Sequence, residues 1–410
     1  MTSTQERQFQ VYGYRWVILA VYALINAVMQ IQWLTFAPIA REAREAYNAT
    51  ALQIDLLSMV FMLVFLAMCI PASYILDKYG IRVGVGIGAA LAGVFGLMKG
   101  VFAESYAMVM VAQIGLSVAQ PFILNSITKV AVHWFPINER ATAVGIATLA
   151  QFLGMIVVNI ATPLMITQTG GTYDLQGMLL TWGVVSAVSA ALLIVFLREY
   201  PPTHAGIEGG EERLLTLDGL KHIFRHRDMI LAMLMFFFGL GIFNAVATCI
   251  DQISEIKGFD IEQSGMIMGI MLIAGIIGAI IFPPISDKLR KRKPLLLLGV
   301  MLLTPGLAGM ALADSYVFML VAAGLVGMFL LGTAGPIGFQ YVAEVSYPAP
   351  ESLSQGIVLL AGQISGIIFI VVMNGMGMIS SLFLFTGLAA VTIIIAALMK
   401  ESPRILTASK

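Results

Sequence analysis

Long apolar runs separated by short polar segments dominate the chain from residue 14 to residue 399. A helix that crosses the bilayer needs about 20 predominantly apolar residues, and each run comes close to that length. The pattern therefore predicts twelve transmembrane helices. The runs fall at about 14–38, 51–76, 83–103, 106–132, 141–167, 176–197, 229–250, 263–284, 294–313, 316–343, 354–378 and 380–399.

Polar side chains recur at helical spacing inside some of these runs. In NAVMQIQWLTF, residues 26–36, the side chains of Asn26, Gln30 and Trp33 share one helix face, whereas Gln32 points elsewhere. Two more stripes have similar spacing: Gln113, Ser117 and Gln120 on helix 4, and Asn244, Thr248 and Asp251 on helix 7. Uncompensated polar groups are costly in lipid, so the stripes should face a bundle interior. Each amide could serve a helix–helix hydrogen bond, but stripes on several helices favour a shared binding cavity.

Composition supports a polytopic membrane protein. Hydrophobic residues make up 59% of the chain and charged residues only 11%, whereas soluble domains carry about 25% charged residues. The net charge of zero predicts no attraction to nucleic acid. The first apolar run is too long, and begins behind too polar a head, for a cleavable signal peptide.

The basic residues predict the orientation. With the N-terminus inside, nineteen Lys and Arg residues fall on the cytoplasmic side and four (Arg41, Arg44, Lys99 and Lys257) on the outside. Both termini are therefore expected in the cytoplasm. Short termini and loops are typical of a bacterial inner-membrane protein, and we expect a monomer.

The chain is expected to consist of two related halves. The only long polar segment, 198–228, reads as a cytoplasmic linker between an N-terminal lobe (1–197) and a C-terminal lobe (229–410) of six helices each. Three features recur in the same order in both halves. They are Asp77-Lys78 and Asp287-Lys288, Pro121 and Pro336, which should interrupt helices 4 and 10, and Gln151-x-x-Gly154 and Gln363-x-x-Gly366.

Two parallel six-helix repeats joined by a cytoplasmic loop resemble the major facilitator superfamily. This resemblance implies an all-α fold in which helices 1, 4, 7 and 10 line a central cavity and the lobes rock around the substrate. The link LDKYGIR, 76–82, resembles the family's signature between helices 2 and 3, although Ser73 replaces the usual glycine. It implies a cytoplasmic latch formed by Asp77, Gly80 and Arg82, with Asp287 as the counterpart; a solvated basic turn is the alternative.

The chemistry of the expected cavity is neutral. The acidic residues in or beside the spans, Asp55, Asp251 and Glu344, lie near span ends, and no Lys or Arg lies deep in helix 1, 7 or 10. An anionic substrate would lack a counter-charge, and proton coupling would lack a central carboxylate. An amide-rich, aromatic cavity suits a polar neutral solute or a quaternary ammonium bound by cation–π attraction.

Longer stretches resemble the feline leukaemia virus subgroup C receptor family. They are NAVMQIQWLTF, IDLLSMVFM (54–62), AQPFILNSITKVAVHWF (119–135), GIFNAVATCIDQI (241–253) and GFQYVAEVSYP (338–348). That family comprises facilitators implicated in choline and ethanolamine transport and in haem export. The resemblance implies that Met62, Gln120 and Gln363 face the cavity. Two positions differ: Gln30 stands at the family's helix-1 tryptophan, with Trp33 one turn later, and Phe236 stands at a helix-7 tyrosine.

We therefore expect an alternating-access facilitator for a small polar or cationic metabolite such as choline or ethanolamine. Its substrate site is expected to comprise Asn26, Gln30, Trp33, Met62, Gln120, Phe236, Asn244 and Gln363. Proton-coupled transport of another metabolite or drug is the alternative and would require Asp55, Asp251 or Glu344 to titrate. A haem exporter is a further alternative, but His133, His204, His222 and His226 all fall at or beyond cytoplasmic span ends.

Other classes of function lack their sequence features. The sequence contains no large extramembrane domain of the kind that a receptor would need. It also contains no nucleophile–base pair or nucleotide-binding loop that would indicate an enzyme. We expect no cofactor and no resident metal. The expected partners are the lipid bilayer and a small-molecule substrate.

Overall fold

The computed structural model describes residues 12–136, 139–169, 172–202, 223–347, 349 and 351–402. Some side chains inside helices, including those of Asp77 and Asp287, lie outside this description, as does most of the expected linker. Within the described residues, twelve helical segments are long and apolar enough to cross a membrane, which confirms the predicted all-α, twelve-span architecture.

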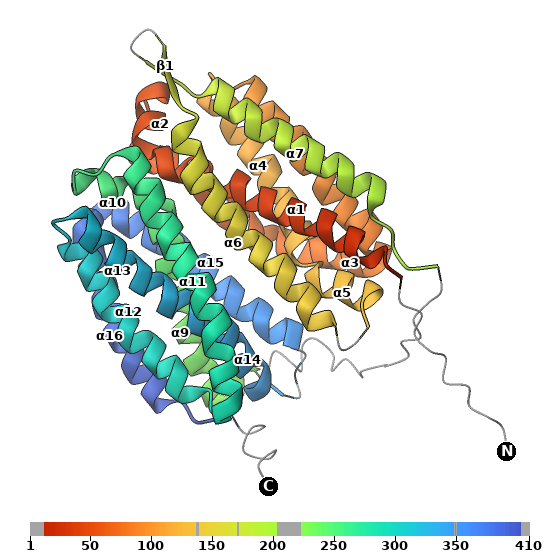
Figure 1. Cartoon of the computed structure of the whole chain (residues 1–410), viewed down its shortest axis with the longest axis vertical. Helices are drawn as coiled ribbons and strands as arrows, with labels where there is room; N and C mark the ends of the chain where they lie inside the picture. Colours follow the sequence, from red (N-terminus) through yellow and green to blue (C-terminus); the bar gives the residue numbers. More distant parts are fainter. Residues whose placement is uncertain are drawn as a thin grey trace. The chain divides into compact units, whose positions relative to one another are not determined.

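Helices account for almost all of the elements (Figure 1). Those of the first half are α1 (Arg15–Leu34), η1 (Ala37–Ile39), α2 (Ala40–Tyr47), α3 (Ala51–Val101), α4 (Tyr106–Leu124), α5 (Ile127–Trp134), α6 (Arg140–Leu164) and α7 (Gln176–Phe196). Those of the second half are α9 (Arg227–Thr248), α10 (Ile250–Ile256), α11 (Ile261–Leu289), α12 (Lys293–Leu312), α13 (Tyr316–Phe329), η2 (Leu330–Ala334), α14 (Pro336–Val345), α15 (Glu351–Met376) and α16 (Met378–Leu398). An antiparallel hairpin of β1 (Thr167–Thr169) and β2 (Thr172–Asp174) pairs Gln168 with Tyr173.

Several spans are interrupted where the sequence carries Gly or Pro. The element α3 contains two spans, because Gly80 has a φ of 85° and breaks the helix between them. Pro121 lies inside α4, which ends three residues later, while Pro336 opens α14 after the short π-helical segment η2. Proline tolerates the first turn of a helix and disrupts its interior. The interruption predicted at Pro336 is therefore a helix start after an irregular turn.

The chain divides into two compact units, and three of the boundaries between them fall inside α1, α3 and α6. The first unit comprises Met1–Trp33, Val64–Met155 and Leu175–Glu211, and the second comprises Leu34–Leu63, Ile156–Asp174 and Glu212–Lys410. The second unit thus contains short parts of the first sequence repeat.

Small residues allow the helices of each unit to approach closely. In the first unit, a Cβ on Gly154 of α6 would lie 2.1 Å from the carbonyl oxygen of Ala27 in α1. In the second, a Cβ on Gly327 of α13 would meet the backbone of Met271 in α11. Close contact at small residues is the usual way in which helices pack in membranes.

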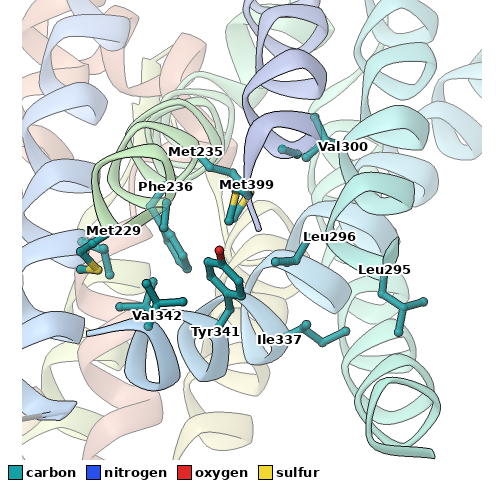
Figure 2. Packing of buried hydrophobic residues seen from close by; sticks show 14 of the residues in the cluster. Met229, Met235, Phe236, Leu295, Leu296, Val300, Ile337, Tyr341, Val342 and Met399 are labelled. Atoms are coloured by element: carbon teal, nitrogen blue, oxygen red, sulfur yellow. The ribbon is translucent and has the colours of Figure 1, made fainter. Parts of the chain in front are cut away.

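A buried apolar cluster holds together one end of the second unit (Figure 2). It joins residues of α9, α12, α14 and the end of α16 around Tyr341, whose hydroxyl donates to the carbonyl oxygen of Lys400 at 2.8 Å. The main members drawn in Figure 2 are Met229, Met235, Phe236, Leu295, Leu296, Val300, Ile337, Tyr341, Val342 and Met399.

Candidate functional site

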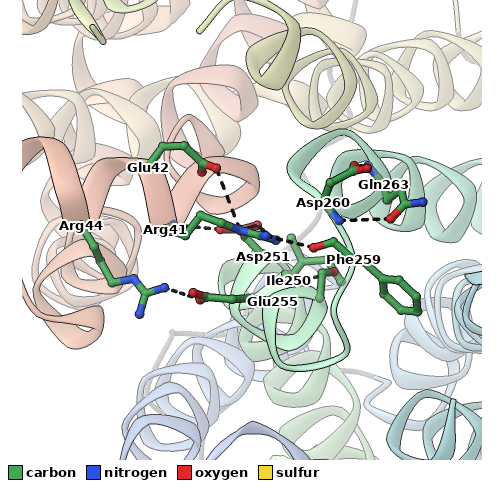
Figure 3. Close-up of polar contacts among 10 residues, drawn as sticks. Arg41, Glu42, Arg44, Ile250, Asp251, Glu255, Phe259, Asp260 and Gln263 are labelled. Carbon is green, nitrogen blue, oxygen red and sulfur yellow. Dashed lines mark hydrogen bonds and ion pairs between the residues drawn. The ribbon is translucent and has the colours of Figure 1, made fainter. Parts of the chain in front are cut away.

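An ion pair joins α2 to α10 within the second unit (Figure 3). The helix α1 ends at Leu34, and the turn η1 with Pro38 leads into α2, where Arg41 pairs with Asp251. Arg41 donates from Nη2 and Nε to Oδ1 of Asp251 at 2.7 and 3.0 Å, and from its backbone nitrogen to Oδ2 at 2.8 Å. Its Nη1 also donates to the carbonyl oxygen of Phe259 at 2.9 Å. Three further charged residues, Glu42 and the paired Arg44 and Glu255, lie beside this contact.

Asp55 forms a second polar contact in the same unit. Its Oδ1 accepts a hydrogen bond from Nε2 of Gln252 at 2.7 Å, and its Oδ2 accepts one from Nδ2 of Asn374 at 2.6 Å. The thiol of Cys249 lies 3.5 Å from Oδ2. The carboxylate therefore links the start of α3 to α10 and α15. Because it is 2% exposed, these donors replace the water that it would otherwise bind.

The three carboxylates named as candidates for proton coupling each have protein partners. Burial raises the pKa of Asp251, while the hydrogen bonds and positive charge of Arg41 oppose that shift. Glu344 lies in α14, where Oε1 accepts from Nη2 of Arg292 at 3.2 Å and from Nε2 of Gln340 at 2.9 Å. Their role in coupling stays a prediction.

Two of the expected substrate-binding residues meet on α15. A Cβ on Gly366 would lie 3.0 Å from Sδ of Met62 and 3.0 Å from both Cβ and Nδ2 of Asn244. Nδ2 of Asn244 donates to the carbonyl oxygen of Gly362 at 3.3 Å. The absence of a side chain at Gly366 is what allows a thioether and an amide to come together there. Gln363, one position after Gly362, is half-buried.

The amides expected to line the cavity from the first unit fall into two classes. Asn26 is fully buried and engaged: it donates to the carbonyl oxygen of Tyr22 at 2.8 Å, and its Oδ1 accepts from Nε2 of Gln151 at 3.2 Å. Gln30 and Gln120 are 3% and 7% exposed, and neither side chain has a hydrogen-bond partner among the described residues. A nearly buried amide without a partner is unfavourable, which singles out these two as groups suited to an external ligand.

Gln32 and Gln113 contribute to packing inside the first unit. Nε2 of Gln32 donates to the carbonyl oxygen of Trp182 at 2.8 Å, and Nε2 of Gln113 lies 3.4 Å from the carbonyl oxygen of Gln32. The same carbonyl lies 3.5 Å from Nζ of Lys99, which is completely buried. The sequence predicted only that Lys99 lies on the outer side of the membrane. Its burial was not foreseen, because the last turn of a span reads like the start of a loop.

The remaining two substrate-site candidates are apolar contacts. Phe236 is 3% exposed and belongs to the cluster of Figure 2, with its ring centroid 4.9 Å from that of Phe339. Trp33 is 7% exposed. Four candidates (Asn26, Gln30, Trp33 and Gln120) thus belong to the first unit and four (Met62, Phe236, Asn244 and Gln363) to the second.

The expected latch contains a residue that the sequence analysis missed. Glu199 accepts hydrogen bonds from the backbone nitrogens of Ile81 at 3.0 Å and Arg82 at 2.7 Å, where the second span of α3 begins. A Cβ on Gly80 would lie 2.4 Å from Oε1 of Glu199. A carboxylate does stabilise a helix N-terminus here, but it comes from the segment that follows α7. The side chains of Asp77 and Asp287 lie outside the described residues.

The second repeat uses the same arrangement. Glu401, after α16, accepts from the backbone nitrogens of Arg292 at 2.7 Å and Lys293 at 3.3 Å, where α12 begins. The signal was present in the sequence as Arg-Glu-Tyr-Pro at 198–201 and Lys-Glu-Ser-Pro at 400–403, each directly after the sixth apolar run of its half.

Two of the four histidines are described, and both lie at helix ends. His133 is in the last turn of α5 with Nδ1 3.2 Å from the carbonyl oxygen of Glu199, and His226 directly precedes α9. His204 and His222 lie outside the described residues. Among the residues described, no group of three or more His, Cys, Asp or Glu is placed to hold a metal ion.

The sequence of the chain matches the model of the Major Facilitator Superfamily over residues 18–370. The chain belongs to this superfamily. It is therefore a multi-pass membrane transporter and not an enzyme, and its twelve spans are those of a facilitator.

Curated relatives are similar over most of the chain. Solute carrier family 49 member A3 of Danio rerio is 28% identical over 386 residues, which cover 90% of this chain and 80% of that protein. The choline/ethanolamine transporter FLVCR2 of Homo sapiens is 27% identical over 380 residues, covering 87% of this chain and 70% of that protein. The resemblance to the feline leukaemia virus subgroup C receptor family is thus confirmed at low identity.

Solved structures share the fold. A D-xylose–proton symporter matches with a TM-score of 0.74 at 13% identity, covering 95% of this chain and 99% of that one. A bacterial homologue of the human lysosomal transporter Spinster, inward-facing and unoccupied, matches with a TM-score of 0.72 at 15% identity and covers 98% of both chains. At such identities the likeness concerns the fold alone.

Proposed function

We propose that this transporter carries a small polar or cationic amine metabolite, such as choline or ethanolamine, by alternating access. Curated relatives with 25–28% identity bear the name choline/ethanolamine transporter. The observation that carries the proposal is the pair of nearly buried amides, Gln30 and Gln120, that have no described hydrogen-bond partner.

The candidate residues suit an amino alcohol chemically. Amide oxygens accept from a hydroxyl or an ammonium group, and amide N–H groups donate to the hydroxyl oxygen. The thioether of Met62 offers a polarizable apolar contact beside Asn244. Trp33 supplies an aromatic face of the kind that attracts a quaternary ammonium.

Transport assays in proteoliposomes test the proposal. Radiolabelled choline and ethanolamine should enter vesicles that contain the protein faster than empty vesicles, and the flux should not require a proton gradient. Asn244→Ala should reduce the flux, whereas Thr304→Ala, which removes only a hydroxyl bonded within α12, should not. Flux that depends on the proton gradient would favour the coupled alternative. Flux no faster than in empty vesicles would exclude this substrate class.

The proposed location is a bacterial inner membrane with both termini in the cytoplasm and the transporter acting as a monomer. The excess of Lys and Arg on one side supports this orientation. Labelling of cysteines introduced at Lys78 and at Lys257 with a membrane-impermeant maleimide would test it: in intact cells, only the cysteine at position 257 should react.

A further inference from the structure

The two repeats differ in the environment of one arginine. Arg82 and Arg292 are equivalent, because each supplies a backbone nitrogen to the glutamate that follows the last helix of its half. Arg292 is 8% exposed, and its guanidinium donates to Glu344 at 3.2 Å and to Ser286 at 3.0 Å. The side chain of Arg82 is exposed and has no described partner. Among the described residues, the second repeat thus pairs its arginine with a carboxylate, whereas the first shows no such partner for the side chain of Arg82.

Arg82 borders a groove that contains a second arginine. The groove has a volume of about 530 Å³ and is lined by Arg82, Val195, Leu197, Arg198, Glu199 and Tyr200. The guanidinium of Arg198 lies 5.6 Å from the centre of the Tyr14 ring and has no described carboxylate partner. The one carboxylate in the lining, Glu199, already accepts two backbone hydrogen bonds from Ile81 and Arg82. The groove therefore offers two positive side chains for an external anion.

The wall of the groove is apolar on the side of the spanning helix. Val195 is 70% exposed, and its neighbours Ile194 and Phe196 in α7 are 47% and 38% exposed. On a helix that crosses the bilayer, such side chains face acyl chains. A soluble anion would make no use of that wall, whereas a phospholipid would place its phosphate at the arginines and its chains along the helix.

We propose that Arg82 and Arg198 form a binding site for the headgroup phosphate of an anionic phospholipid. Guanidinium groups bind phosphate by paired hydrogen bonds, and basic pockets at the cytoplasmic ends of spans bind anionic headgroups. The lipid completes in the first repeat the neutralisation that Glu344 provides in the second. The bound lipid would contact the loop between the second and third spans. It would therefore link the lipid that surrounds the protein to the segment expected to act as a latch.

Lipid binding to the purified protein tests this site. The protein in a neutral detergent is titrated with phosphatidylglycerol and, separately, with a galactolipid of the same acyl chains, and retained lipids are counted by native mass spectrometry. The galactolipid has neither a charge nor a choline or ethanolamine group, so it controls for chain binding without presenting a candidate substrate. We expect phosphatidylglycerol to be retained in preference to the galactolipid.

Variants that remove positive charge distinguish binding at this site from non-specific attraction of the anionic lipid to basic residues. Arg82→Gln/Arg198→Gln should need on the order of ten-fold more phosphatidylglycerol for the same occupancy. Lys288→Gln/Lys291→Gln removes the same charge from the equivalent loop of the second repeat, where both side chains are exposed, and should bind as the wild type does. If the double variant folds poorly, Arg198→Gln alone should still weaken retention, since the Arg198 side chain has no described hydrogen-bond partner and packs only over the ring of Tyr14 among the described residues.

Three outcomes would overturn the proposal. The first is unchanged phosphatidylglycerol retention in Arg82→Gln/Arg198→Gln, and the second is an equal loss in Lys288→Gln/Lys291→Gln. The third is equally effective displacement of the lipid by glycerol 1-phosphate at the same concentration, which would identify a site for a soluble anion.

Discussion

Arg41 and Asp251, which are 210 positions apart, share three hydrogen bonds of 2.7–3.0 Å. Asp77 and Asp287 of the matching Asp-Lys pairs have the same separation, so the two partners occupy equivalent positions in the repeats. Equivalent positions of the two repeats thus carry opposite charges that pair with each other. The pair holds α2, which follows α1 and η1, against α10, which follows α9.

Removal of Arg41 should destabilise the protein strongly. The side chain of Asp251 is 0% exposed, and Arg41→Met would leave a buried carboxylate without its cation. Breaking one side of a buried pair costs on the order of 3–5 kcal/mol. The double variant Arg41→Met/Asp251→Asn removes both charges and should recover most of the loss. Chemical unfolding in mixed micelles measures both values, and equal losses in the two variants would contradict this account.

The stability of the Arg41→Met variant relative to the wild type should increase as the pH is lowered. Burial raises the pKa of Asp251, and Arg41 opposes that shift, so the variant should have a still higher pKa. A carboxylate whose pKa is higher in the folded state stabilises the fold when protonated and loses this contribution as the pH rises. The stability deficit of Arg41→Met should therefore shrink as the pH is lowered from neutral. Asp251→Asn in the same background should abolish the trend.

Cys249 should report on the Asp55 contact. Burial and the negative charge of Asp55 both raise the pKa of the Cys249 thiol, so little reactive thiolate forms at neutral pH. In a Cys69→Ser background, maleimide should label Cys249 slowly, and Gln252→Ala/Asn374→Ala should increase the rate several-fold by loosening the cluster. Thr386→Ala, whose hydroxyl bonds within α16, is the control. Unchanged labelling in the double variant would argue that the two amides do not shield the thiol.

Substitutions of Glu199 and of Gly80 should have non-additive effects on the free energy of unfolding. Loss of a helix-capping side chain costs about 0.5–2 kcal/mol, and we expect this from Glu199→Ala and from its counterpart Glu401→Ala. Gly80→Ala should cost more, because Gly80 has a positive φ and its new Cβ would displace the Glu199 carboxylate. In the Glu199→Ala background there is no carboxylate for the new Cβ to displace, so Gly80→Ala should destabilise the protein less. A cycle of unfolding measurements on the four proteins tests this, and strict additivity would count against it.

Substitutions of the amides in the first unit should have different effects, depending on whether the amide forms hydrogen bonds within the protein. Gln30→Met and Gln120→Met remove groups without a described partner, so we expect a change in unfolding free energy within about 0.5 kcal/mol together with a loss of transport. Asn26→Leu leaves the amide of Gln151 without its acceptor and should cost about 1–3 kcal/mol. Melting temperature and flux are measured on the same preparations. A stability loss in Gln30→Met equal to that of Asn26→Leu would assign Gln30 to packing.

The number of spans, the repeat and the superfamily can all be inferred from the sequence alone. The thickness of the hydrocarbon core fixes the length of an apolar run, so the twelve spans can be read without knowledge of how they pack. The positions at which spans break were also accessible, since Gly80 and Pro336 act on the local backbone.

Which polar groups find hydrogen-bond partners within the protein depends on how the helices pack. Gln32 and Gln30 are close in the sequence, yet one donates to Trp182 and the other has no described partner. Lys99 and Glu199 read as loop charges, but one is buried and the other stabilises a helix start more than a hundred residues away. Hydrogen bonds and ion pairs are short-ranged, so they depend on which helix faces lie within about 3 Å of one another. Hydropathy contains no such information, because it describes each span against lipid and not against its neighbours.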